Sequence, residues 1–296
     1  MNIKLISVAV AIAITICLNA QRLNTEIIIE GQEPYLVGQV DKSGLLGKNY
    51  RSWFTENYNN YKPNDSLINL IAPALKEIEI KIFMGTWCGD SRRDVPNLYR
   101  ILEACNFPMK NLLTVALSNE DHMYKKSPQQ EEVGLNIHRV PTIIFYKNGK
   151  EINRIVEYPV KTLEEDILEI ISGNDYESNY YIVTELNQIL KKEGTIGLKE
   201  KTDQLLKKYK GQVYDASELN AYGKLLLDNK KIEEGIAVLQ FNTLLLPEDS
   251  YTFLDLADIL SDLEKNDEAI IVLESGLKTH PNDEDLKQKL KMLNNN

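Results

Sequence analysis

The chain has 296 residues, a net charge of −10 and a hydrophobic content of 43%. Its length exceeds that of one ordinary domain and indicates two, and its hydrophobic residues are enough to fill real cores, which excludes a globally disordered chain. An acidic chain without a long basic run also argues against binding to nucleic acid or to an anionic membrane surface.

The first twenty residues have the pattern of a signal peptide. Lys4 provides a positive start, residues 5–18 are almost wholly apolar, and Ala20 offers a small residue before a cut at Gln21. An uncleaved anchor is the alternative, although this apolar run is shorter than the ~20 residues that a membrane helix needs. Cys17 follows the bulky Ile16, which disfavours lipid attachment. We therefore expect an exported protein, periplasmic or secreted, in an oxidising compartment.

Residues 21–34 are predicted to be a polar, loosely ordered lead-in, and residues 35–173 alternate strand-like and helix-like runs, which indicates an α/β domain. Asn148 and Gly149 favour a tight hairpin turn, because both turn positions need a positive φ. The elements expected in chain order are a helix over 65–75 capped by Asn64 or Asp65, a strand over 79–84, a helix over 92–104 carrying Pro96, a strand over 111–117, a loop with a short helix over 118–136, a hairpin of strands 140–146 and 151–156, and a helix over 161–171.

The remainder of the chain is predicted to be helical. Two bridging helices, 180–192 and 198–209, occupy the segment 174–215. Pro247 and Pro281 then lie 34 residues apart, and small residues recur at the same spacing, with Gly223 matching Ala257 and Gly235 matching Ala269. This period resembles the tetratricopeptide repeat, with copies over 216–249 and 250–283 and a closing cap helix inside a domain that spans 216–296. An unrelated helical bundle is the alternative.

The stretch Trp87-Cys88-Gly89-Asp90-Ser91 carries the strongest chemical signal. It follows an apolar strand and precedes a helix, so Cys88 is expected near a helix N-terminus, where free N–H groups and the helix dipole favour the nucleophilic thiolate. A second cysteine at residue 91 would complete a Cys-x-x-Cys motif, but this position holds Ser91.

Four features in order resemble the thioredoxin family over residues 35–173. They are the strand leading into Trp87 and Cys88, the helix with Pro96, the Val140-Pro141-Thr142 strand start and the Asn-Gly hairpin. The resemblance implies a thioredoxin-like fold, a central mixed sheet flanked by helices. It also implies that Cys88 attacks disulfides, that Trp87 shapes the surface beside it, and that Val140, Pro141 and Thr142 bind substrate. Pro141 would be a cis proline, with the Val140 backbone pairing to a bound polypeptide.

Two departures from the family pattern limit the reactions that Cys88 can perform. Without a second cysteine, Ser91 cannot resolve a mixed disulfide, although its hydroxyl could donate a hydrogen bond to the Cys88 thiolate. Ile82 stands where thioredoxins commonly bury an aspartate.

Cys105 lies 17 residues beyond Cys88, or ~25 Å along a helix, so these two cysteines should not pair within one molecule. Cys105 is therefore expected to be a buried filler.

Three functions therefore remain open. Cys88 could exchange disulfides and be released by another thiol, as in a monothiol oxidoreductase or isomerase. It could form long-lived mixed disulfides, or the fold could be a redox-inactive scaffold. The expected partners are a polypeptide thiol or disulfide and a protein bound by the helical repeats, with no cofactor and no metal. His138, three residues before Pro141, is predicted to be a surface loop histidine rather than part of the site.

Overall fold

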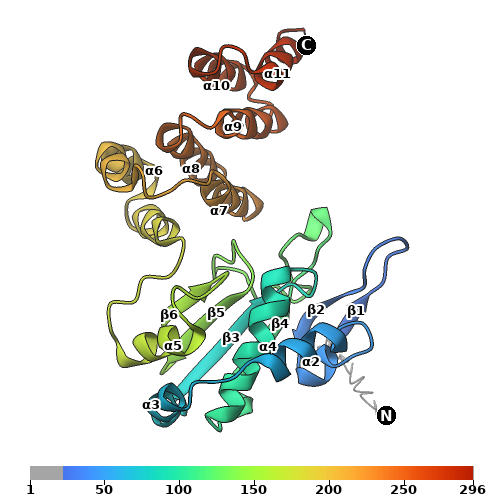
Figure 1. The fold of residues 1–296 in the computed structure, drawn as a ribbon. Coiled ribbons are helices and arrows are strands. Elements are labelled where there is room, and N and C mark those ends of the chain that lie inside the picture. The colour runs from blue at the N-terminus through green and yellow to red at the C-terminus, as the bar shows by residue number, and fades with distance from the viewer. Residues whose placement is uncertain (1–22, 296) are drawn as a thin grey trace, which may run out of the picture.

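The computed structural model describes residues 23–295, which form an α/β region followed by a helical region (Figure 1). The predicted signal peptide, with Cys17, lies outside the described residues. Within residues 23–295, no helix combines the length and the apolar character needed to cross a membrane.

A six-stranded mixed sheet forms the centre of the first region. Only β3 and β4 run parallel; the other neighbouring pairs are antiparallel. Residues 25–27 were expected in a loose lead-in but pair with β2, so the sheet begins earlier than predicted. In sheet order the strands are β1 (Thr25–Ile27), β2 (Tyr35–Val40), β4 (Leu112–Ala116), β3 (Ile78–Met84), β5 (Thr142–Lys147) and β6 (Lys150–Val156).

Helices flank this sheet, which confirms the predicted fold class. One sheet face shares its core with buried residues of α2 to α5, and the other face packs a smaller core that includes Ile137 and Val140 from the loop before β5. The sequence did not predict α2, in which only Phe54 is buried, so its apolar periodicity is weak. The helices are α1 (Lys42–Leu45), α2 (Arg51–Asn60), α3 (Asp65–Leu75), α4 (Gly89–Ala104) and α5 (Leu163–Ser172), with short 3-10 turns at Met109–Asn111 and Asp121–Met123.

Local sequence signals explain several of these boundaries. The Asn64 side chain caps α3 by accepting hydrogen bonds from the backbone N–H groups of Ser66 and Leu67. At the β5–β6 turn, Asn148 and Gly149 have φ values of 54° and 72°, the left-handed conformation that the predicted hairpin requires. α4 begins at Gly89, three residues earlier than predicted, because the polar residues of its first turn carry no apolar pattern.

The helical region contains α6 (Tyr181–Tyr209), α7 (Ser217–Asp228), α8 (Ile232–Leu245), α9 (Ser250–Asp262), α10 (Asn266–Thr279) and α11 (Glu284–Asn294). Gly194, with a φ of 67° and a ψ of −163°, breaks α6 into two halves that correspond to the two predicted bridging helices. α8 contributes to two successive cores: its Val238 and Phe241 pack with α6 and α7, while its Ile236 and Leu239 pack with α9 to α11.

Small residues allow α7 and α8 to approach closely. A Cβ atom added at Gly235 would lie 2.7 Å from Leu227 Cγ and 2.9 Å from the Gly223 carbonyl oxygen. Both distances are too short for a real Cβ contact, so this position accepts only glycine without rearrangement. The predicted close pairing at Gly223 and Gly235 is therefore confirmed.

Substituting Gly235→Val should destabilise the α7–α8 pair by about 2 kcal/mol, because the new side chain overlaps Leu227 and the Gly223 backbone. Hydrogen exchange of the amides in α7 and α8 measures this loss as a lower free energy of local opening. Gln240→Val adds the same residue at an exposed site on α8 and serves as the matched control. Equal protection in the two variants would contradict the steric argument.

Candidate functional site

Cys88 lies at the junction between β3 and α4, where it is the N-cap residue of the helix. Its backbone carbonyl accepts a 3.0 Å hydrogen bond from the Arg92 N–H, which closes the first helical turn. The side chain is half-buried and the thiol is free. The predicted placement of Cys88 at a helix N-terminus is thus confirmed, and its sulfur remains accessible.

The loop before β5 lies directly against Cys88. The Val140–Pro141 peptide bond is cis, as the family resemblance implied. The Cys88 thiol lies 3.2 Å from the Val140 carbonyl oxygen and donates a hydrogen bond to it. Thr142 is buried and its hydroxyl donates a 2.7 Å hydrogen bond to the Arg139 carbonyl, which fixes the loop ends around Val140 and Pro141. These residues therefore come together as predicted.

Ser91 does not make the hydrogen bond that the sequence suggested. Its side chain is fully buried, and its hydroxyl oxygen accepts a 3.2 Å hydrogen bond from the Gly85 N–H. Among the hydrogen bonds of the described residues, none joins Ser91 to Cys88. Ser91 therefore stabilises the turn that carries the cysteine. Ile82, the other departure from the family pattern, is a fully buried core residue in β3.

An aromatic pair flanks the cysteine on the solvent side. The rings of Trp87 and Tyr124 lie 5.4 Å apart, and the Trp87 indole donates a 2.9 Å hydrogen bond to the Leu117 carbonyl. Tyr124 is 45% exposed, so the pair forms an open apolar surface beside Cys88. The expectation that Trp87 shapes this surface agrees with its position, while Tyr124 was not predicted.

Lys125 is a second residue that the sequence did not identify. Its ammonium donates a 2.7 Å hydrogen bond to the His138 carbonyl and lies 5.0 Å from the centre of the Tyr124 ring. Burial and the charge of Arg139 lower the pKa of Lys125 to about 8, while Glu157 and Cys88 act in the opposite direction. The group is thus still mainly cationic at pH 7. The only feature of the sequence that could have pointed to Lys125 is the pair of lysines at residues 125 and 126 in a polar loop.

His138 is buried, which corrects the prediction of a surface histidine. Its ring makes edge contacts with Tyr180 and Tyr222, both contributed by the segment that follows the α/β region. Its Nε2 atom is buried without a hydrogen-bond partner among the described residues. Burial lowers the pKa of His138 to about 3, so the ring is neutral at physiological pH. The sequence could not reveal this, because the covering tyrosines lie 42 and 84 residues away.

Arg139 links the cysteine loop to the helical region. Its guanidinium donates a 2.8 Å hydrogen bond to the Ser217 hydroxyl at the start of α7 and lies 3.7 Å from a Glu157 carboxylate oxygen. It also lies 5.1 Å from the centre of the Tyr180 ring. A second contact joins the two regions at Lys126 and Asp228, 3.7 Å apart. Arg139 directly precedes Val140, whose carbonyl accepts the hydrogen bond of the Cys88 thiol. The helical region is therefore attached next to the residue that contacts the cysteine.

The second cysteine plays no part in this site. Cys105 caps the far end of α4 and is 1% exposed, as expected for a buried filler. Burial, with a smaller effect from Glu164, raises the pKa of Cys105 to about 11. The two cysteines of the described residues are therefore unpaired, with Cys88 the one accessible to a partner.

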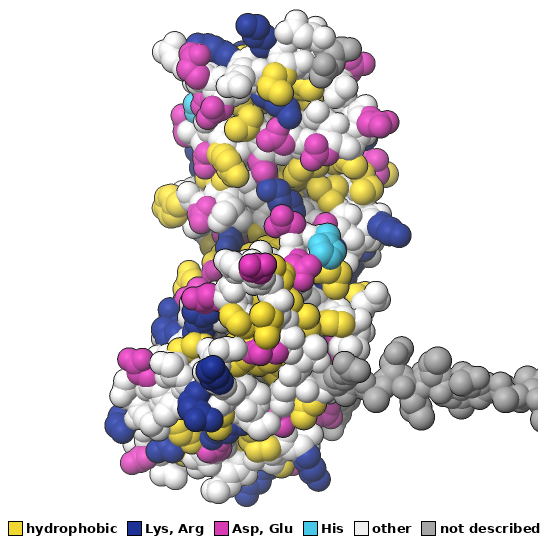
Figure 2. All heavy atoms as spheres, turned by 90° about the vertical axis from the view of Figure 1, so that its right-hand side faces the viewer, with side chains coloured by type: hydrophobic (Ala, Val, Ile, Leu, Met, Phe, Trp, Pro, Cys, Tyr) yellow, Lys and Arg dark blue, Asp and Glu magenta, His cyan; other side chains and the backbone are white. Residues whose placement is uncertain are grey.

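One face of the molecule shows no uniform charge. Figure 2 shows basic and acidic side chains interspersed over both regions, with small groups of hydrophobic side chains between them.

Residues 46–169 match the sequence model of a family described as thioredoxin. The matched segment includes the Cys88 turn, the cis Val140–Pro141 bond and the β5–β6 hairpin, and it ends before the helical region. No curated protein matches the chain. The match supports a thioredoxin-like domain, with a role related to thiols and disulfides at that general level.

His138 makes stability depend on pH. Its folded-state pKa lies below the unfolded value near 6.5, so the folded protein loses about 1.4 kcal/mol per pH unit as the pH falls from about 6.5 towards 3. His138→Phe retains an aromatic ring but cannot be protonated. We expect its free energy of unfolding, measured by urea denaturation between pH 4 and 7.5, to fall less steeply than that of the wild type. Parallel pH profiles would refute this assignment.

Proposed function

We propose that this protein performs thiol–disulfide exchange on polypeptides through the single cysteine Cys88. The observation that carries the proposal is the accessible Cys88 thiol at the N-cap of α4, against the cis Val140–Pro141 loop, with the buried hydroxyl of Ser91 at the position of a resolving thiol. This arrangement supports nucleophilic attack but supplies no internal second thiol.

In the proposed reaction, the Cys88 thiolate attacks one sulfur of a substrate disulfide. A bond forms between Cys88 Sγ and that sulfur, the substrate S–S bond breaks, and the other substrate sulfur leaves as a thiolate that takes up a proton. A second thiol, from the substrate itself or from a small molecule, then attacks the mixed disulfide as its thiolate and regenerates the Cys88 thiolate. The cycle exchanges disulfides and needs no external oxidant.

The proposed setting is an exported one. The apolar segment over residues 5–18, with Lys4 before it and Ala20 after it, supports export to the periplasm or secretion. Disulfide substrates are abundant in such compartments, whereas the reducing cytosol keeps most thiols reduced.

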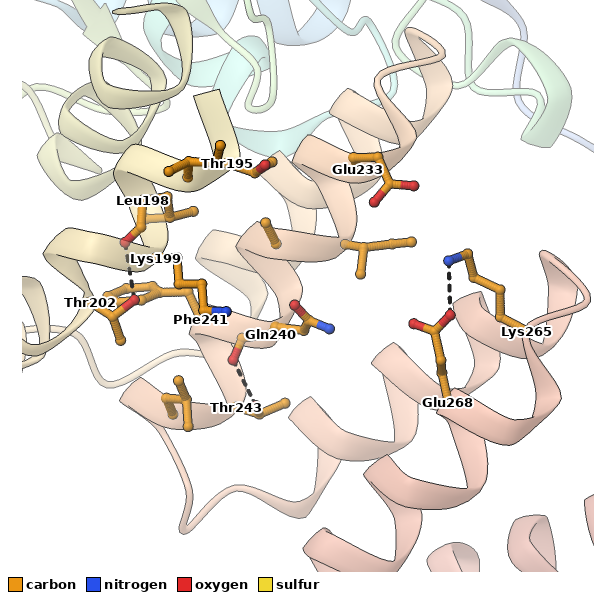
Figure 3. A pocket seen from close by; sticks show the side chains of 14 residues that line it. Thr195, Leu198, Lys199, Thr202, Glu233, Gln240, Phe241, Thr243, Lys265 and Glu268 are labelled. Atoms are coloured by element: carbon orange, nitrogen blue, oxygen red, sulfur yellow. Dashed lines mark hydrogen bonds and ion pairs between the residues drawn. The ribbon is translucent and has the colours of Figure 1, made fainter. Parts of the chain in front are cut away.

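We further propose that the helical region, with its two tetratricopeptide-like helix pairs, binds a protein partner. A groove of about 540 Å³ lies among α6, α8 and α10, away from Cys88 (Figure 3). Gln240 extends into it between Lys199 on one side and the Lys265–Glu268 ion pair on the other. Ile196 and Leu244, 71% and 55% exposed, add apolar contact area. This mixed lining supports contact with a polypeptide surface.

Cys88→Ser should reduce exchange on a peptide disulfide, in the presence of glutathione, to the uncatalysed rate, because a serine hydroxyl is not ionised at neutral pH. Mass spectrometry of the peptide products over time measures the rate. Cys105→Ser is the matched control and should retain wild-type exchange, since Cys105 is buried far from the site. A wild type no faster than Cys88→Ser would refute the catalytic proposal.

Ser91→Cys tests whether the missing thiol limits release. A thiol one helical turn from Cys88 should shorten the lifetime of a Cys88 mixed disulfide about tenfold or more, because intramolecular attack has a high effective concentration. Quenching by rapid alkylation, followed by non-reducing gels, counts the trapped complexes. The conservative control Ser91→Ala removes the hydroxyl without adding a thiol and should leave the lifetime unchanged. Equal lifetimes in Ser91→Cys and Ser91→Ala would contradict the expectation.

A further inference from the structure

A cavity of about 310 Å³ lies at the junction of the two regions. The α/β region contributes Tyr124, Lys125 and Arg139 to its wall, and α7 contributes Ala221 and Lys224. Neither region forms this cavity alone. It is also distinct from the larger groove among α6, α8 and α10, which shares no lining residue with it.

The cavity is connected to the cysteine through its own wall. Tyr124 packs on Trp87, the residue before Cys88, and the charge of Cys88 affects the pKa of both Tyr124 and Lys125. Arg139 immediately precedes Val140, whose carbonyl accepts the hydrogen bond of the Cys88 thiol. A polypeptide whose cysteine is bonded to Cys88 can therefore reach the cavity with its neighbouring residues.

The charged lining of the cavity is mainly cationic. The lining includes three cationic side chains, Lys125, Arg139 and Lys224, and one carboxylate, that of Asp228. The Asp228 carboxylate lies 3.7 Å from Lys126, and Lys224 pairs with Asp255 at 2.6 Å. Lys125 differs from these cations, because no carboxylate of residues 23–295 lies within ion-pair distance of its ammonium.

Two further carboxylates, Glu157 and Glu218, lie near Arg139, and Glu157 is 3.7 Å from its guanidinium. Burial raises the pKa of Glu218 to about 7, and burial also raises the pKa of Glu157. Glu218 therefore carries less negative charge near neutral pH than a solvated glutamate would, whereas the Arg139 guanidinium opposes the rise in the pKa of Glu157. A chain with a net charge of −10 thus presents a cation without an ion-pair partner among the described residues, Lys125, in the wall of this cavity.

We propose that this cavity binds an acidic side chain of the polypeptide substrate, close in sequence to the cysteine that reacts with Cys88. The Lys125 ammonium is the principal partner of the incoming carboxylate, and the exposed rings of Tyr124 and Tyr251 form the apolar rim around it. The inference rests on the proposed exchange function and defines the substrate class of the same site. α7 is thereby part of the substrate site rather than a separate module.

Three synthetic peptides test this proposal on the full chain. Each has a central cysteine activated as a mixed disulfide with thionitrobenzoate, and its two residues on each side are all Glu, all Gln or all Lys. Attack by Cys88 on the peptide sulfur releases the coloured thionitrobenzoate thiolate, so the absorbance gives the rate. Each rate is divided by the rate of the same peptide with a small uncharged thiol, which removes intrinsic differences in reactivity.

The wild type should react roughly three- to tenfold faster with the Glu peptide than with the Lys peptide at low salt. Lys125→Gln should abolish most of that preference, while Lys110→Gln, an exposed lysine in the Met109–Asn111 turn, should retain it. Ala221→Phe fills the cavity from α7 and should also reduce the preference. Iodoacetamide alkylation of Cys88 should proceed at the wild-type rate in Ala221→Phe, which shows that the site itself is intact.

The outcomes separate the two proposals. Equal normalised rates for the Glu and Lys peptides in the wild type would overturn the acidic-substrate inference and leave exchange by Cys88 intact. A preference that persists in both Lys125→Gln and Ala221→Phe would also overturn it, because the selectivity would then lie elsewhere. Failure of every peptide to react faster with wild type than with Cys88→Ser would instead refute the exchange function.

Discussion

The turn between β3 and α4 is the constraint on which the site depends. Three hydrogen bonds from different elements hold it: the Leu36 N–H of β2 donates to the Thr86 hydroxyl, the Trp87 indole donates to the Leu117 carbonyl, and the Gly85 N–H donates to the Ser91 hydroxyl of α4. Each of these bonds is buried or partly buried, so the loss of one would leave a buried polar group without a hydrogen-bond partner. The turn therefore cannot move without disturbing the sheet or the helix, and Cys88 is held at the N-terminus of α4.

The sequence was sufficient to predict the features that depend on neighbouring residues. The Asn148–Gly149 turn and the position of Cys88 before a helix follow from local backbone chemistry and were predicted correctly, and Asn64 is one of the two caps predicted for α3. The close approach at Gly223 and Gly235 followed from a repeated spacing of small residues. The mixed sheet followed from the family resemblance, since no local pattern distinguishes parallel from antiparallel pairing.

The features that the sequence did not predict depend on contacts between distant segments. His138 is buried only because Tyr180 and Tyr222 cover it, and Lys125 is held by the His138 carbonyl. The Ser91 hydroxyl was expected to bond Cys88 but accepts from the Gly85 N–H, a choice that depends on how the turn folds back on the helix. The junction at Arg139 and Ser217 joins residues 78 positions apart, so no pattern within either region indicates it.

The buried hydroxyl of Ser91 determines how the site would respond to its surroundings. An enzyme with two thiols stores an internal disulfide, and its oxidised fraction varies with the disulfide concentration divided by the square of the monothiol concentration. Under the proposed exchange function, Cys88 alone would form only a mixed disulfide, whose fraction would vary with the simple ratio of disulfide to thiol. Diluting both species equally would then leave its occupancy unchanged. Such a site would report the composition of the surrounding thiol pool and would be insensitive to the size of that pool.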